Sequence, residues 1–74
     1  MDPEVTFAQM FDRTEGVSNV DRIEAGEDLL EWLQRGGYVP ERLQSASGGL
    51  VTDVELRGFA FGFVRVFVAC LKRN

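Results

Sequence analysis

The 74-residue chain contains no histidine and only one cysteine, Cys70. Enzymes that use a serine or cysteine nucleophile need a base, normally histidine, so this chemistry is not expected. One cysteine cannot form an intrachain disulfide, and a structural zinc site takes about four Cys or His ligands. Cys70 falls on an apolar stripe, where burial makes a thiol unreactive. We therefore expect no enzyme activity, no cofactor, no metal and a buried Cys70.

Lysine is almost absent, and acidic residues outnumber basic ones by 12 to 8, which gives a net charge of −4. Nucleic acid attracts clustered Lys and Arg, so direct nucleic-acid binding is not expected. The longest apolar run, Phe59 to Leu71, is interrupted by Arg65 and is shorter than the ~20 residues that span a bilayer. The acidic first residues are atypical of a secretory signal. The composition predicts a cytoplasmic protein without membrane association.

The length of the chain predicts one helical domain over residues 1–74. Hydrophobic residues make up 45% of the sequence and charged residues 27%, a balance typical of folded chains. Domains this small bury only roughly 60% of the surface that their unfolded form exposes. Without disulfides or metal, stability must come from good packing or from a partner subunit.

Two helices are predicted in the first half of the chain. The first covers residues 3–14, where an Asp-Pro pair opens a segment with apolar residues every three or four positions. The second covers residues 19–35. Ser18 and Asp21 have the spacing of a capping box, and two glycines follow the segment.

The second half predicts one long helix over residues 53–72, opened by a Thr-x-x-Glu capping box. Pro40–Leu43 can add a single helical turn. The predicted fold class is therefore all-α, a small bundle of three main helices plus a short turn of helix. An α+β fold with a C-terminal hairpin is the alternative, because Phe and Val also favour strands; Leu50–Leu56 then pairs with Phe59–Val68.

Five carboxylates follow one side of the predicted second helix, and we call them the acidic stripe: Asp21, Glu24, Glu27, Asp28 and Glu31. Like charges four residues apart cost an isolated helix about 0.2–0.5 kcal/mol per pair. A helix that retains them can use them to attract a basic protein surface. The alternative is a solvated face that only keeps the domain soluble.

The predicted C-terminal helix carries two apolar stripes instead of one. The first consists of Leu56, Phe59, Phe63, Val66 and Phe67, and the second of Phe61, Val64, Val68 and Leu71. A 20-residue helix is about 30 Å long, and two shorter helices are too few to cover both of its sides. Large exposed apolar patches mark binding sites, so we expect this helix to be buried against a second chain.

Small residues and one arginine lie between the stripes. A Gly-x-x-x-Gly pattern lets another backbone come close, although the first or second helix of the same chain can also pack there. We predict a homodimer whose self-association face is made by Gly58, Phe61, Gly62, Arg65, Val68 and Ala69. Arg65 is most simply a side chain that extends its charged end into solvent; the alternative is an interface arginine that meets a carboxylate such as Glu24 or Asp28, on this or another subunit.

The leading functional hypothesis is a non-enzymatic protein–protein interaction module. It self-associates through the apolar C-terminal helix and presents the acidic stripe to a protein partner. The alternative is a small acidic inhibitor of phage or plasmid type, a nucleic-acid mimic that blocks a basic groove on its target.

Overall fold

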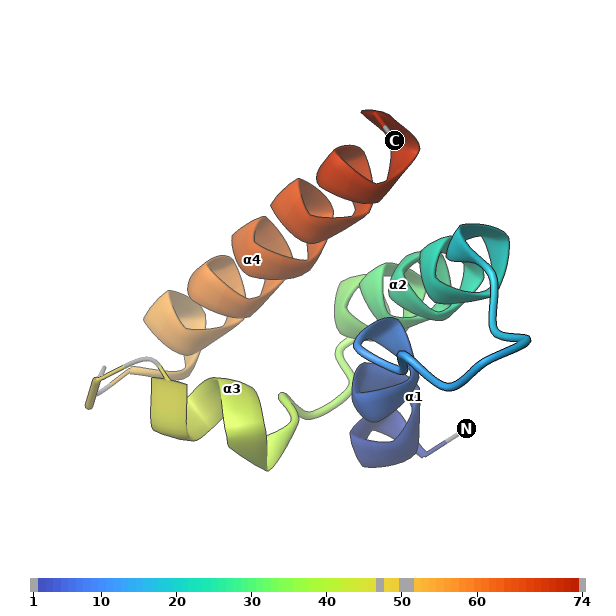
Figure 1. The fold of residues 1–74 in the computed structure, drawn as a ribbon. Coiled ribbons are helices and arrows are strands. Elements are labelled where there is room, and N and C mark those ends of the chain that lie inside the picture. Colours follow the sequence, from blue (N-terminus) through green and yellow to red (C-terminus); the bar gives the residue numbers. More distant parts are fainter. Residues whose placement is uncertain (1, 47, 50–51, 74) are drawn as a thin grey trace.

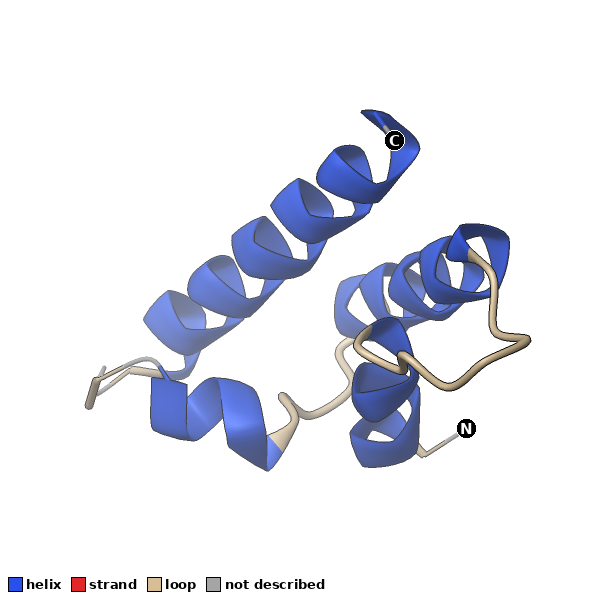
Figure 2. Ribbon diagram, viewed as in Figure 1, coloured by secondary structure: helices blue, strands red, loops and turns tan. Residues whose placement is uncertain are grey.

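A computed structural model describes residues 2–46, 48–49 and 52–73. It contains the helices α1 (Pro3–Met10), α2 (Asn19–Gln34), α3 (Glu41–Ala46) and α4 (Asp53–Arg73) (Figure 1). No strand occurs among the described residues (Figure 2), so the all-α prediction is confirmed and the hairpin alternative is wrong. Leu50 and Val51, where that hairpin was to begin, lie outside the described residues, as does Ser47.

Helix α2 packs against both α1 and α4, and α3 leads from the end of α2 to the beginning of α4 (Figure 1). The described residues that pack in the core come from all four helices: Met10, Leu29, Leu43, Ala60 and Val64 have no exposed surface. The molecule measures 38 Å along its longest axis. A 21-residue helix such as α4 is about 32 Å long, so α4 extends over most of this length.

The long helices begin where their capping residues predict. In α2, the Ser18 hydroxyl accepts a hydrogen bond from the Asp21 N–H at 3.3 Å, and the Asp21 carboxylate accepts one from the Ser18 N–H at 3.1 Å. At the start of α4, the Thr52 hydroxyl accepts a hydrogen bond from the Glu55 N–H at 3.1 Å. The observed ends of α2 and α4 differ from the predicted ends by one residue each.

The predicted end of the first helix is wrong, because α1 stops at Met10 instead of residue 14. Beyond it, the Asp12 carboxylate accepts a hydrogen bond from the Thr14 N–H at 2.8 Å. Such a side-chain turn offers the backbone an alternative to the helix. Arg22 holds the turn in place, because its Nε donates to the Asp12 carbonyl at 2.6 Å. The predicted helical turn at Pro40–Leu43 is also longer than expected, since α3 continues to Ala46.

Helices α2 and α4 approach closely at Gly26 and Val68. A Cβ atom added to Gly26 would collide with the Val68 side chain, so only glycine leaves room for α4 at this point. Val68 is 5% exposed. The contact determines which side of α4 faces inward.

Arg57 joins the beginning of α4 to the end of α2. Its guanidinium donates to the carbonyl oxygens of Leu33 at 3.1 Å, Gly36 at 2.6 Å and Gly37 at 2.7 Å. The Leu33 carbonyl belongs to the last turn of α2, whose carbonyls lack the usual helical partners, and Gly36 and Gly37 follow the end of the helix. Its Nε also lies 3.3 Å from the Asp53 carboxylate. One side chain therefore caps α2 and anchors α4.

Two glycine substitutions should have opposite effects on the free energy of unfolding. Gly26→Ala inserts a methyl group against Val68 and should lower it by about 1–3 kcal/mol. Gly58→Ala meets no atom within 4 Å and should raise it by about 0.5–1 kcal/mol, because alanine favours helix. Urea unfolding at low protein concentration measures both; equal effects would contradict the packing of α2 on α4.

Removing the Arg57 cap should also destabilise the protein. Arg57→Met keeps most of the aliphatic stem but removes the guanidinium that donates to three carbonyls, and should lower the free energy of unfolding by about 1–3 kcal/mol. Arg42→Met is the matched control, because Arg42 is exposed on α3 and its loss should cost less than about 0.5 kcal/mol. Equal unfolding midpoints for the two variants would show that Arg57 has no capping role.

Candidate functional site

The outer side of α4 carries an apolar groove of about 560 Å³, which we call the α4 groove. It is lined by Gly58, Phe59, Gly62, Phe63, Val66, Phe67 and Cys70. All seven residues belong to α4 and lie away from its buried residues, which are Ala60, Val64 and Val68. The groove is therefore a helix face that the described part of the chain covers only in part: Gly58, Phe63, Val66 and Cys70 are exposed, and Phe59, Gly62 and Phe67 are half-buried.

An aromatic cluster forms one wall of the α4 groove and joins it to the end of α1. The Phe11 ring lies 4.6 Å from the Phe67 ring and 6.4 Å from the Phe63 ring, measured between centroids. Phe7 and Phe59 each lie 6.2 Å from Phe63. Tilted aromatic pairs of this kind contribute about 0.5–1.5 kcal/mol beyond their buried area. The wall is thus held in place by contacts within the chain.

Gly58 and Gly62 leave the groove open along its length. A Cβ atom added to either glycine would meet no atom within 4 Å, so neither α1 nor α2 packs there. Glycine inside a helix costs roughly 0.5–1 kcal/mol relative to alanine. At Gly26 this cost is offset, because the glycine leaves room for α4. No contact among the described residues requires Gly58 or Gly62 to be glycine.

The structure corrects the predicted self-association face. Val68 is in the core against Gly26, and Phe61 is half-buried and packs on the core. Arg65, Ala69 and Gly58 are exposed as expected, and Gly62 is half-buried. The two apolar stripes are similar in size and hydrophobicity, so their composition did not indicate which one α2 would cover. The uncovered stripe is the one that contains Phe63 and Val66.

Cys70 is exposed at one end of the α4 groove, so the prediction that it is buried is wrong. It belongs to the outward side of α4, two positions after the buried Val68. The core contains residues of the second stripe instead.

The carboxylates of the acidic stripe are all exposed, but they do not act as one surface. Asp21 serves in the capping box of α2. Glu27 lies 3.4 Å from the Lys72 ammonium, and Glu31 forms an ion pair with Arg35. Glu24 and Asp28 make no ion pair within the described residues. Arg65 makes none there either, so the alternative in which it pairs with the acidic stripe is not seen within this chain.

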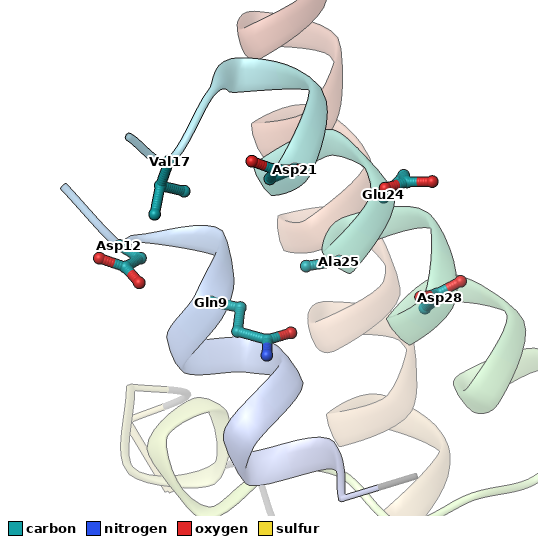
Figure 3. Close-up of a pocket in the computed structure, with 7 residues that line it drawn as sticks. All are labelled: Gln9, Asp12, Val17, Asp21, Glu24, Ala25 and Asp28. Carbon is teal, nitrogen blue, oxygen red and sulfur yellow. The ribbon is translucent and has the colours of Figure 1, made fainter. Parts of the chain in front are cut away.

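A second hollow, which we call the acidic cleft, lies between the end of α1 and the first half of α2 and measures about 350 Å³. Figure 3 shows its lining residues, which are Gln9, Asp12, Val17, Asp21, Glu24, Ala25 and Asp28. Three of its carboxylates belong to the acidic stripe. The fourth, Asp12, was not among the predicted site residues; its signal in the sequence is the Asp-x-Thr pattern of a side-chain turn.

Asp12 stays ionised at lower pH than an ordinary aspartate, because its pKa is lowered. Hydrogen bonds from the side chain and backbone of Thr14 lower its pKa, and the charge of Arg22 adds to the effect. Because the pKa of Asp12 is lower in the folded state, its ionised carboxylate stabilises the fold at pH values above the unfolded pKa. This stabilisation is lost as the pH falls through the folded pKa. The acidic cleft therefore keeps this negative charge throughout the neutral range.

The described residues contain no group of three acidic or cysteine side chains placed to hold a metal ion. Nor does any helix within those residues have the length and apolar character needed to cross a membrane. No protein-family model, curated protein or solved structure matches this chain.

Proposed function

We propose that the chain is a non-enzymatic protein–protein interaction module that self-associates through the α4 groove. The observation that supports this most is the groove itself, an apolar helix face with an aromatic wall, on which Gly58, Val66 and Cys70 are exposed. Apolar patches of this kind on small soluble proteins mark binding sites. The exposed thiol of Cys70 is also in keeping with a reducing compartment such as the cytoplasm.

The exposed groove residues supply the driving force for association. Val66 is 63% exposed and Phe63 is 37% exposed. Fully burying a Val or Phe side chain contributes roughly 1.5–3 kcal/mol, so covering Val66 alone contributes about 1 kcal/mol. Burial of the other apolar side chains along α4, including Phe59 and Phe67, adds to this free energy. The total can exceed the entropic cost of association.

A charge placed in the α4 groove should prevent association. Val66→Glu would bury an unpaired carboxylate, and should raise the dimer dissociation constant at least about tenfold, equivalent to ~1.4 kcal/mol. Val20→Glu is the matched control, because Val20 is similarly exposed, at 66%, but lies on α2. Light scattering during size-exclusion chromatography gives the mass of each, and circular dichroism checks that both remain helical. Equal masses for the two variants at every concentration would contradict the proposal.

A second binding role is favoured by the acidic cleft, where Asp12, Asp21, Glu24 and Asp28 lie together. Four carboxylates around a hollow attract a basic segment of a partner. The same surface suits a small acidic inhibitor that occupies a basic groove on its target. We place this role after self-association, because acidic clusters are also common on solvated helix faces.

The acidic cleft can be tested with an arginine-rich peptide at low ionic strength, where exposed charges are least screened. Glu24→Gln/Asp28→Asn removes the two stripe carboxylates that have no ion pair among the described residues. Glu15→Lys raises the net charge by the same two units from an exposed position outside the cleft. We expect the double variant to bind the peptide several-fold more weakly than the Glu15 variant, by fluorescence titration. Equal losses would show that only net charge matters.

A further inference from the structure

The outward face of α4 contains a regular seam in which residues alternate at spacings of four and three. Its members are Glu55, Phe59, Gly62, Val66, Ala69 and Arg73. Residues at this spacing lie on one side of a helix, along which a second helix can pack. Four members are exposed, whereas Gly62 and Phe59 are half-buried and Phe59 also packs against the core. The described residues therefore leave most of the seam open.

We propose that the α4 groove is occupied by the α4 groove of a second copy, with the two α4 helices antiparallel about a two-fold axis at the level of Val64. The inference rests on the proposed self-association and adds the partner, the orientation and the register. In a two-fold interface the same patch on each copy must be complementary to itself. The seam meets this condition in both size and charge.

Side-chain size favours the antiparallel orientation. Gly62 and Val66 are each two positions from Val64, and Phe59 and Ala69 are each five positions from it. In the antiparallel pair, Gly62 therefore faces Val66 of the second copy, and Phe59 faces Ala69. Each large side chain meets a small one, which is the arrangement that fills space without overlap. A parallel pair would instead place Phe59 against Phe59 and leave Gly62 against Gly62.

Charge at the two ends of the seam favours the same orientation. Glu55 and Arg73 are each nine positions from Val64 and lie five helical turns apart on one side of α4, about 27 Å along its axis. In the antiparallel pair, each Glu55 lies opposite Arg73 of the second copy. A parallel pair would oppose like charges at both ends. Exposed ion pairs add only about 0–1 kcal/mol, so the charges select the orientation more than they strengthen it.

Both end residues are available for this contact. Glu55 is exposed, and although its carboxylate accepts the Thr52 hydroxyl at 2.8 Å, a carboxylate has further acceptor sites. Arg73 is exposed and forms no salt bridge with another described residue. An unfavourable contact arises between the two copies of Arg65, which flank the middle of the seam. Arg65 is exposed, so its long side chain can diverge into solvent, where salt screens the repulsion.

A face one helix wide is small for a specific interface. Interfaces that bury less than about 1,200 Å² in total are usually weak or transient. We therefore expect a dimer that dissociates at micromolar concentration. Its orientation must be measured at concentrations where the dimer is populated, and the mass of the protein must be recorded in the same samples.

Cross-linking between single cysteines tests the orientation. Two variants, Glu55→Cys and Arg73→Cys, are each made with Cys70→Ser, so that each chain carries one exposed thiol. A short bis-maleimide is added to each variant alone and to an equimolar mixture. The antiparallel pair should give a covalent dimer only in the mixture, because the two copies of one introduced cysteine are about 27 Å apart along the seam. The control variant is Glu15→Cys with Cys70→Ser. Glu15 is exposed and lies outside the groove, so cross-linking of this variant measures chance collisions.

Each other outcome overturns a defined part of the inference. Cross-linking of each variant with itself would show a parallel pair, which contradicts the orientation and leaves self-association standing. A dimeric mass without cross-links above the Glu15 control would show that another surface forms the dimer. A monomeric mass at all concentrations would overturn both the inference and the proposed function, and would leave the α4 groove to a different protein.

Discussion

The close contact of Gly26 with Val68 determines how the rest of the molecule is arranged. Glycine allows α2 to approach α4 closely, and this approach turns Val64, Val68 and Ala60 inward. With α2 on that side of α4, α1 packs on α2, and the contacts with α4 from α1 and its end include the rings of Phe7 and Phe11. No described helix remains to cover the outward face of α4. The exposed groove is thus a consequence of how the core is filled.

Side-chain contacts near both ends of α4 join it to α2. Arg57 ties the beginning of the helix to the end of α2 through three backbone carbonyls. Near the other end, the Lys72 ammonium lies 3.4 Å from the Glu27 carboxylate. Because Arg57 anchors the beginning of α4, that part of the helix loses little further freedom on binding. This reduces the entropic cost of association, which matters for an interface as small as one helix face.

Local signals predicted the helices well, because caps act within a few residues. Ser18 with Asp21 and Thr52 with Glu55 placed the beginnings of α2 and α4 correctly. The end of α1 was missed because the turn at Asp12 competes with the helix and is fixed by Arg22, ten residues away. Arg57 was missed for a similar reason, since its carbonyl partners lie 20 to 24 residues earlier in the chain.

The candidate site was predicted only in part. The sequence indicated that α4 has more apolar surface than two short helices can cover, and the structure leaves an apolar groove on it. It did not indicate which stripe would remain outside, because that choice depends on the contact of Gly26 with Val68 between two helices. Val68 and Cys70 were therefore assigned to the wrong sides of α4. The five carboxylates of the acidic stripe are exposed, as their spacing on the helix indicated. The ion pair of Glu27 with Lys72 could not be predicted, because it joins residues 45 positions apart.

If a second chain covers the outward face of α4, the reactivity of Cys70 in the unaltered protein depends on the protein concentration. The thiol is exposed in the single chain and lines the α4 groove. The account predicts that the rate constant for its reaction with a small disulfide reagent falls several-fold as the protein concentration rises from low to high micromolar. A rate constant that stays the same over that range would contradict it.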